Sequence, residues 1–199
     1  MNTYKSDYIF INCPFDDEYI PLLFPLLFTI IYLGKEPLIS ETQDSGENRF
    51  EQIIKLMKKA NYSIHDLSRI DSNPPRFNMP LELGFDLCLK RSKQYSKKVI
   101  LILEGEQYSL KSIMSDLAGN DTKHHNNSPE EIVKCVRNWF FTTIEKIDIK
   151  YNEIINNYLS FIEVFINDLK ISSVKEIKDI SFSEIIYNMQ KWIEKLINK

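Results

Sequence analysis

Short apolar segments alternate with segments of helical periodicity along the first half of the chain, and this alternation restricts the fold more than any other feature. We expect strands over residues 8–12, 37–41, 62–67 and 99–103. The last is five consecutive apolar residues, which is typical of a strand covered on both faces. Strands that alternate with helices form a parallel sheet, because right-handed crossovers place the helices on its faces. The sequence therefore predicts a doubly wound α/β fold, with the carboxyl ends of all four strands at one edge.

The helical segments divide the chain into two parts. The first helix is expected to follow the acids at Asp16 and to end at Gly34, and a later one has Ser128 as its N-cap. After residue 103 we expect a short helix over 108–117 and a polar loop over 121–128 with a brief edge strand. Longer helices are expected over residues 16–34, 50–60, 79–91, 129–144, 151–169 and 185–196. We therefore predict an α/β domain over residues 1–147 and a C-terminal helical extension over 148–199, packed on that domain or on a partner.

Composition excludes several classes of protein. The net charge of −3 argues against a nucleic-acid partner, which usually meets a basic face. Five glycines, none of them suitably spaced, exclude a GxGxxG fingerprint and a P-loop. Three distant cysteines provide no CxxC pair for zinc, and we expect no metal site. The longest apolar stretch carries two prolines and is too short to span a membrane, and no signal-like segment opens the chain. These features predict a soluble cytoplasmic protein without a membrane partner.

The candidate site lies where the strands of such a sheet end, because ligands of doubly wound sheets bind outside the carboxyl ends of the strands. Asn12 ends the first expected strand, and Asp66 lies at the end of the third. Asn78 and Glu82 lie at the start of the helix that follows Asp66. We expect these four residues to surround one cleft. The Glu82 carboxylate would stabilise a cation or hold sugar hydroxyls there, or it would serve only as a partner of the helix dipole.

Two further residues are expected on the rim of this cleft, together with the polar loop over residues 42–49. Phe15 follows the first strand end and would stack on a base or pack into the core. Arg49 follows the loop and would bind a pyrophosphate or form a solvated salt bridge. Arg76 is placed in a similar way.

Other residues are interpreted as structural. Cys13 lacks the arginine of a C-x5-R phosphatase motif, because position 19 is tyrosine. Adjacent His124 and His125 favour a loop surface over a metal site. His65 is expected to point to the face opposite Asp66, as a core or interface histidine. Gly84 would let its helix lie close to the sheet or let a ligand approach its backbone.

At this point a resemblance becomes visible. The segment 62–89 contains Asp66-Leu67-Ser68, a proline-rich break and the run N-M-P-L-E-L-G-F that begins at Asn78. It resembles the third strand and following helix of bacterial TIR-like domains, and nucleoside 2-deoxyribosyltransferases share this layout. The opening run 9–16 is similar to a first TIR strand with its loop, and 42–46 lies where TIR domains have their BB-type loop. The resemblance covers residues 8–140 and implies a TIR-like, flavodoxin-like fold.

The resemblance implies an enzyme that cleaves the bond between nicotinamide and ribose in NAD. Glu82 matches the glutamate that acts at the nicotinamide ribose, and NAD is then the substrate, with no other cofactor. The implied setting is bacterial antiviral defence, by NAD depletion or a cyclic ADP-ribose-type signal, with a homo-oligomer or an effector or sensor protein as partner. Two alternatives stay open: a nucleoside 2-deoxyribosyltransferase-like enzyme with the glutamate as nucleophile, and a non-catalytic nucleotide-sensing or interaction module.

Overall fold

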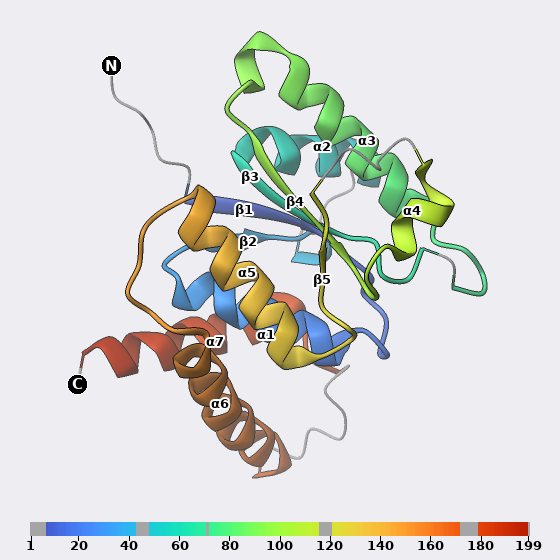
Figure 1. Ribbon diagram of the computed structural model, residues 1–199. Helices are drawn as coiled ribbons and strands as arrows, with labels where there is room; N and C mark the ends of the chain where they lie inside the picture. The colour runs from blue at the N-terminus through green and yellow to red at the C-terminus, as the bar shows by residue number, and fades with distance from the viewer. Residues whose placement is uncertain (1–6, 43–47, 71, 116–120, 172–178, 199) are drawn as a thin grey trace.

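A parallel sheet forms the centre of the molecule in the computed structural model, which describes residues 7–42, 48–70, 72–115, 121–171 and 179–198. Its five strands follow the order β2-β1-β3-β4-β5, and every neighbouring pair is parallel (Figure 1). The strands are β1 (Tyr8–Asn12), β2 (Glu36–Leu38), β3 (Tyr62–Asp66), β4 (Val99–Glu104) and β5 (Lys123–His124). The expected doubly wound α/β fold is confirmed, and its strand order is that of flavodoxin-like proteins.

Helices cover both faces of this sheet. The helices α2 and α3 pack together on one face, and α1 packs with α5 on the other, where the tail helices α6 and α7 are added (Figure 1). Their bounds are α1 (Ile20–Tyr32), α2 (Arg49–Lys59), α3 (Asn78–Arg91), α4 (Ser109–Ile113), α5 (Pro129–Thr143), α6 (Tyr151–Ile171) and α7 (Phe182–Ile197). Short 3-10 turns are η1 (Ser40–Thr42) and η2 (Lys93–Tyr95). No helix in these described ranges is long and apolar enough to cross a membrane.

Two element boundaries and the packing role of one glycine differ from the expectations. The second strand ends at Leu38 rather than at residue 41, because the chain turns into η1 and the Ser40 hydroxyl accepts a hydrogen bond from Arg49. The first helix starts at Ile20 rather than at Asp16, because the Asp16 carboxylate accepts from the Tyr19 amide in a preceding turn. Gly84 is exposed, and a Cβ added there would meet nothing within 4 Å, so close packing on the sheet does not require this glycine, and the approach of a ligand to its backbone stays a prediction.

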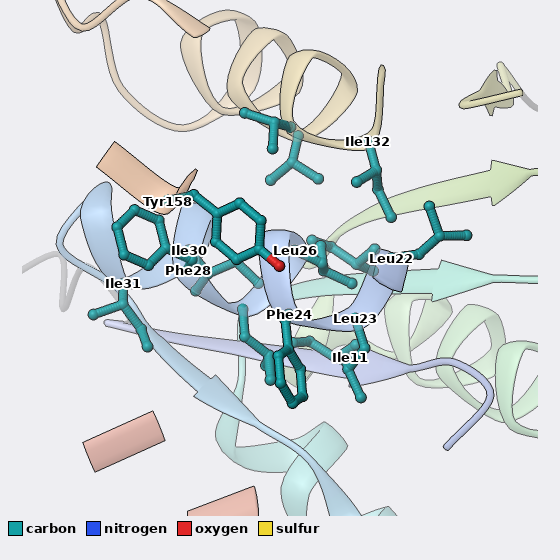
Figure 2. Close-up of a cluster of buried hydrophobic side chains, with 14 of the residues drawn as sticks. Ile11, Leu22, Leu23, Phe24, Leu26, Phe28, Ile30, Ile31, Ile132 and Tyr158 are labelled. Atoms are coloured by element: carbon teal, nitrogen blue, oxygen red, sulfur yellow. The ribbon is translucent and has the colours of Figure 1, made fainter. Parts of the chain in front are cut away.

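The main core surrounds α1, whose residues from Leu22 to Ile31 are all buried. Figure 2 shows its side chains between Ile11 of the sheet, Ile132 of α5 and Tyr158 of α6. The tail helices add further buried side chains to the same cluster, namely Ile154, Phe161, Phe165, Ile185, Met189 and Ile193. The tail is therefore packed on the α/β part of the chain, as a further layer outside α1.

Candidate active site at the carboxyl edge of the sheet

The strand order creates a topological switch point between β1 and β3. The connection from β1 leads to one edge of the sheet and that from β3 to the other, so a crevice is expected beyond their carboxyl ends. The first turn of α3 lies against this point, since the Asn12 side-chain amide donates a 2.9 Å hydrogen bond to the Met79 carbonyl oxygen. Residues from β1, β3 and α3 thus meet at one edge of the sheet.

Glu82 is the acid that α3 contributes to this edge. The next residue, Leu83, is buried in the core between α3 and the sheet, and the Glu82 residue beside it is only 8% exposed. Burial raises the Glu82 pKa to about 7, while the Arg49 charge and a hydrogen bond with Asn78 act in the opposite direction. The site therefore contains a carboxyl group that changes charge near neutral pH, which is the property a catalytic acid or base needs.

Asp66, at the end of β3, has a closed environment. Its fully buried carboxylate accepts hydrogen bonds from the Tyr19 hydroxyl and, at 2.8 Å, from the Ser68 amide. His125 Nε2 lies 3.1 Å from Asp66 Oδ2, the oxygen that also accepts from Tyr19. Burial alone raises the Asp66 pKa, but the contacts with His125, Tyr19 and Ser68 outweigh it and lower the pKa. The structure does not bring this carboxylate to the protein surface beside Glu82.

Asn12 is also turned inward. Its side chain is buried, and its Nδ2 atom lies 3.0 Å from His65 Nδ1 in addition to the bond with Met79. His65 is buried on the α3 side of the sheet, opposite the Tyr19 side on which Asp66 finds its partners, as the alternation of β3 predicts. Any contact of Asn12 with a ligand stays a prediction.

The remaining expected site residues have separate surroundings, and their place on the rim of a cleft stays a prediction. Arg49, at the start of α2, is mostly exposed and pairs with Glu41. Asn78 is exposed at the first position of α3. Phe15 is half-buried and packs edge-on against Phe182 of α7, with ring centres 5.8 Å apart. Of the loop between Glu41 and Arg49, residues 43–47 lie outside the described residues.

Two arginines that follow β3 pair with acids in the loop after β1. Asp16 Oδ2 accepts a 2.6 Å hydrogen bond from Arg76, and Asp16 Oδ1 lies 3.3 Å from Arg69. Arg69 also pairs with Glu18. Sequence reasoning missed Arg69, although its place three residues after the end of β3 is a usable signal. These contacts link the loop after β1 to the loop after β3.

His125 corrects the expectation of a histidine pair on a loop surface. It is fully buried, and the Asn127 amide donates a 3.1 Å hydrogen bond to its Nδ1 atom. Positive φ angles of 51° and 52° at Asn126 and Asn127 turn the chain back on itself, which lets the imidazole point toward Asp66. Across the described ranges, no group of three or more histidine, cysteine, aspartate or glutamate side chains is arranged to hold a metal ion.

The Cys13 thiol and a cavity beside β4 add little to the chemistry. Burial, followed by the charges of Asp66 and Glu82, raises the Cys13 pKa well above its usual value, so this thiol is unreactive. A cavity of about 670 Å³ lies beside β4, between α3 and α5. Two of its lining lysines are paired with neighbouring acids, Lys123 with Asp121 and Lys134 with Glu131. The carboxyl edge therefore remains the better candidate site.

Comparisons of the chain with protein-family models, with curated proteins and with solved structures found no match. Fold and site define an α/β protein with a flavodoxin-like sheet and a largely buried glutamic acid beside the β1/β3 switch point.

Proposed function

We propose that the protein is a TIR-like enzyme that cleaves the nicotinamide–ribose bond of NAD, as a glycohydrolase or cyclase. The observation that carries the proposal is Glu82, a carboxyl group 8% exposed, in the second turn of α3 beside the switch point of the sheet. Ligands of this sheet topology bind at that point. The run from Asn78 to Phe85 that contains Glu82 is also the part of the sequence that most resembles TIR-like domains.

The chemistry suits a buried carboxylate. Breaking the bond between C1′ and the nicotinamide nitrogen leaves oxocarbenium character on the ribose, while nicotinamide departs as a neutral molecule that needs no proton. Ionised Glu82 would offset the developing positive charge, and the effect is large where water is excluded. Water then adds to C1′ and releases one proton to give ADP-ribose, or a nucleophile within the same molecule adds to give a cyclic product.

We further propose that the reaction serves bacterial antiviral defence in the cytoplasm, by depleting NAD or by making a cyclic ADP-ribose-type signal. A second copy of the chain or a sensor or effector protein would control it. This setting rests on the resemblance to TIR-like domains and on no other observation.

The test is the release of nicotinamide from NAD, followed by chromatography over a range of protein concentrations. We expect release by the wild-type protein and a loss on the order of 10²–10³ for Glu82→Gln, which keeps size and removes the charge. The matched control is Glu51→Gln, an exposed acid in the first turn of α2, which should leave the rate unchanged. Equal rates for wild type and Glu82→Gln would contradict the proposal.

A parallel assay separates the alternatives. Transfer of deoxyribose from deoxyinosine to adenine, without nicotinamide release from NAD, would point to a nucleoside 2-deoxyribosyltransferase-like enzyme. Binding of NAD with neither reaction, at every protein concentration, would point to a nucleotide-sensing module. Either outcome would overturn NAD cleavage as the function.

A further inference from the structure

A continuous chain of buried polar side chains runs under the sheet on the face covered by α2 and α3. It joins Lys98, Asp86, His65 and Asn12, all of them buried. Lys98 Nζ lies 3.0 Å from Asp86 Oδ1, Asp86 Oδ2 lies 3.1 Å from His65 Nε2, and His65 Nδ1 lies 3.0 Å from Asn12 Nδ2. The chain ends at the Met79 carbonyl oxygen, in the first turn of α3.

The position of each proton in this chain follows from the last bond. The Met79 carbonyl only accepts, so the Asn12 atom that faces it is the amide nitrogen. The same nitrogen faces His65 Nδ1, which must therefore accept and carry no proton. The proton of neutral His65 is on Nε2, from where it is donated to Asp86. Every link is thus oriented toward holding Asn12 in one position.

The other end of the chain is equally fixed. Besides its contact with Asp86, Lys98 Nζ donates 2.7 Å hydrogen bonds to the carbonyl oxygens of Met57 and Ala60 at the end of α2. Burying such charged groups is costly, and apolar replacements of similar volume are often neutral or stabilising. A contribution to stability is therefore a weak explanation for the chain, and an orienting role is a better one.

The first turn of α3 is not held by a capping side chain. Phe77, the N-cap residue within this described stretch, makes no capping hydrogen bond with its side chain, and Asn78 directs its side chain to Glu82. Asn12 donates to the Met79 carbonyl oxygen, and this bond ties the turn to the end of β1 without replacing a cap.

We propose that His65 and Asn12 are positioning residues for Glu82: the hydrogen bonds from His65 Nδ1 through Asn12 to the Met79 carbonyl hold the first turn of α3 against β1 and so fix the Glu82 carboxyl at the switch point. The catalytic consequence rests on the proposed function, whereas the positioning has its own readout. That readout is the titration of Glu82, because a displaced turn would admit water to the carboxyl group.

Two substitutions of His65 form a matched pair, since each leaves a buried amide. In His65→Asn the amide oxygen takes the place of Nδ1 and still accepts from Asn12, while the contact with Asp86 is lost. In His65→Gln the amide reaches the place of Nε2 and still meets Asp86, while Asn12 loses its acceptor. Asn12→Leu, which keeps the shape and removes the donor, breaks the same link from the other side.

The measurement is NMR titration of the ¹³C-labelled Glu82 carboxyl in the full chain, with kcat and KM for NAD measured alongside. We expect a Glu82 midpoint near 7 in wild type and in His65→Asn, and a midpoint nearer 4.5 in His65→Gln and Asn12→Leu. We expect kcat to fall on the order of tenfold or more in the latter two, with KM little changed, because misplacement of a catalytic group is costly.

Unchanged titration of Glu82 in His65→Gln and Asn12→Leu would overturn the positioning role, as would equal shifts in His65→Asn and His65→Gln. If His65→Gln does not fold, Asn12→Leu decides alone. A wild-type protein that cleaves no NAD would refute the proposed function, while the titration would still decide whether the chain positions Glu82.

Discussion

His125 Nε2 lies 3.1 Å from Asp66 Oδ2, inside the protein and out of contact with solvent. The contact joins the loop after β5 to the end of β3, and with the Tyr19 hydroxyl it keeps Asp66 ionised. Glu82 has the opposite environment, because burial favours its protonated form up to a pKa of about 7. Two acids of one sheet edge are thus separated in pKa, a pattern that assigns different roles to two carboxyl groups in enzymes.

Replacement of Glu82 by glutamine is expected to stabilise the protein above pH 7. The folded-state pKa of Glu82 is raised from 4.5 to about 7, so the carboxyl favours folding below pH 4.5, and that contribution is lost as the pH rises through 7. At pH 8 the ionised carboxyl costs up to about 3 kcal/mol, which glutamine avoids. Urea unfolding of both proteins at pH 5 and pH 8 measures this difference.

The exposed Glu51→Gln protein is the control, and it should show no such gain at pH 8. If Glu82→Gln is less stable than wild type at both pH values, burial does not destabilise the ionised form of Glu82, and this prediction is wrong.

The proposed NAD cleavage is expected to increase with pH through a midpoint near 7, because the ionised form of Glu82 would oppose the positive charge on ribose. A plot of kcat/KM against pH, from about 5.5 to about 8.5 so that it brackets the midpoint, measures this pH dependence. A rate that decreases over this interval would assign Glu82 a role as proton donor instead.

Tyr19→Phe is expected to destabilise the fold by about 1.5–3 kcal/mol, because a buried carboxylate loses a donor. The Asp66 pKa is lowered in the folded protein, so its contribution is present above pH 3.8 and is lost as the pH falls through the folded-state pKa. Without the Tyr19 donor that pKa increases, and acid unfolding should begin at a higher pH. Circular dichroism during acid titration measures the midpoint.

Tyr32→Phe is the matched control, since its hydroxyl donates to the Glu153 carboxylate near the surface. Its acid-unfolding midpoint should stay at the wild-type value. Equal midpoints for wild type and Tyr19→Phe would show that the Tyr19 hydroxyl does not keep Asp66 ionised.

Lys98→Met is expected to cost about 3–5 kcal/mol, because it leaves Asp86 with an uncompensated buried charge and removes the donor of two α2 carbonyl groups. Lys134→Met, which breaks a solvent-exposed pair with Glu131, should change the stability far less. Chemical denaturation of the three proteins at pH 7 compares them, and similar losses for both variants would contradict the importance of the buried pair.

The centre of the sheet was predictable because β1 and β4 are local runs of apolar residues. The approximate bounds of α3, α5 and α6 follow from apolar periodicity. The Ser128 cap was also readable, and its side chain accepts from the Glu131 amide as expected. Local sequence does not indicate where β2 stops, because η1 depends on a contact with Arg49 from the next helix.

The partners of the site residues were harder to predict. Asn12 and His65 are 53 positions apart, and their contact depends on the register of β1 against β3, which alternation alone does not fix. The buried position of His125 depends on two asparagines with positive φ angles, a conformation that a polar loop sequence permits without requiring it. The strand-end rule brought attention to Asp66 and Glu82 but contains no information on which acid would be enclosed.

The burial of α1 on all sides has a consequence for the boundary at residue 147. In a three-layer protein the outer face of such a helix meets water, whereas here Phe28 stacks on Phe161 and contacts Tyr158 of α6. A shortened protein that ends at residue 147 would expose this apolar surface of α1 to water and would be prone to aggregate. We therefore expect the helical tail to fold together with the part of the chain that carries the candidate site, even though the sequence pattern changes near residue 147.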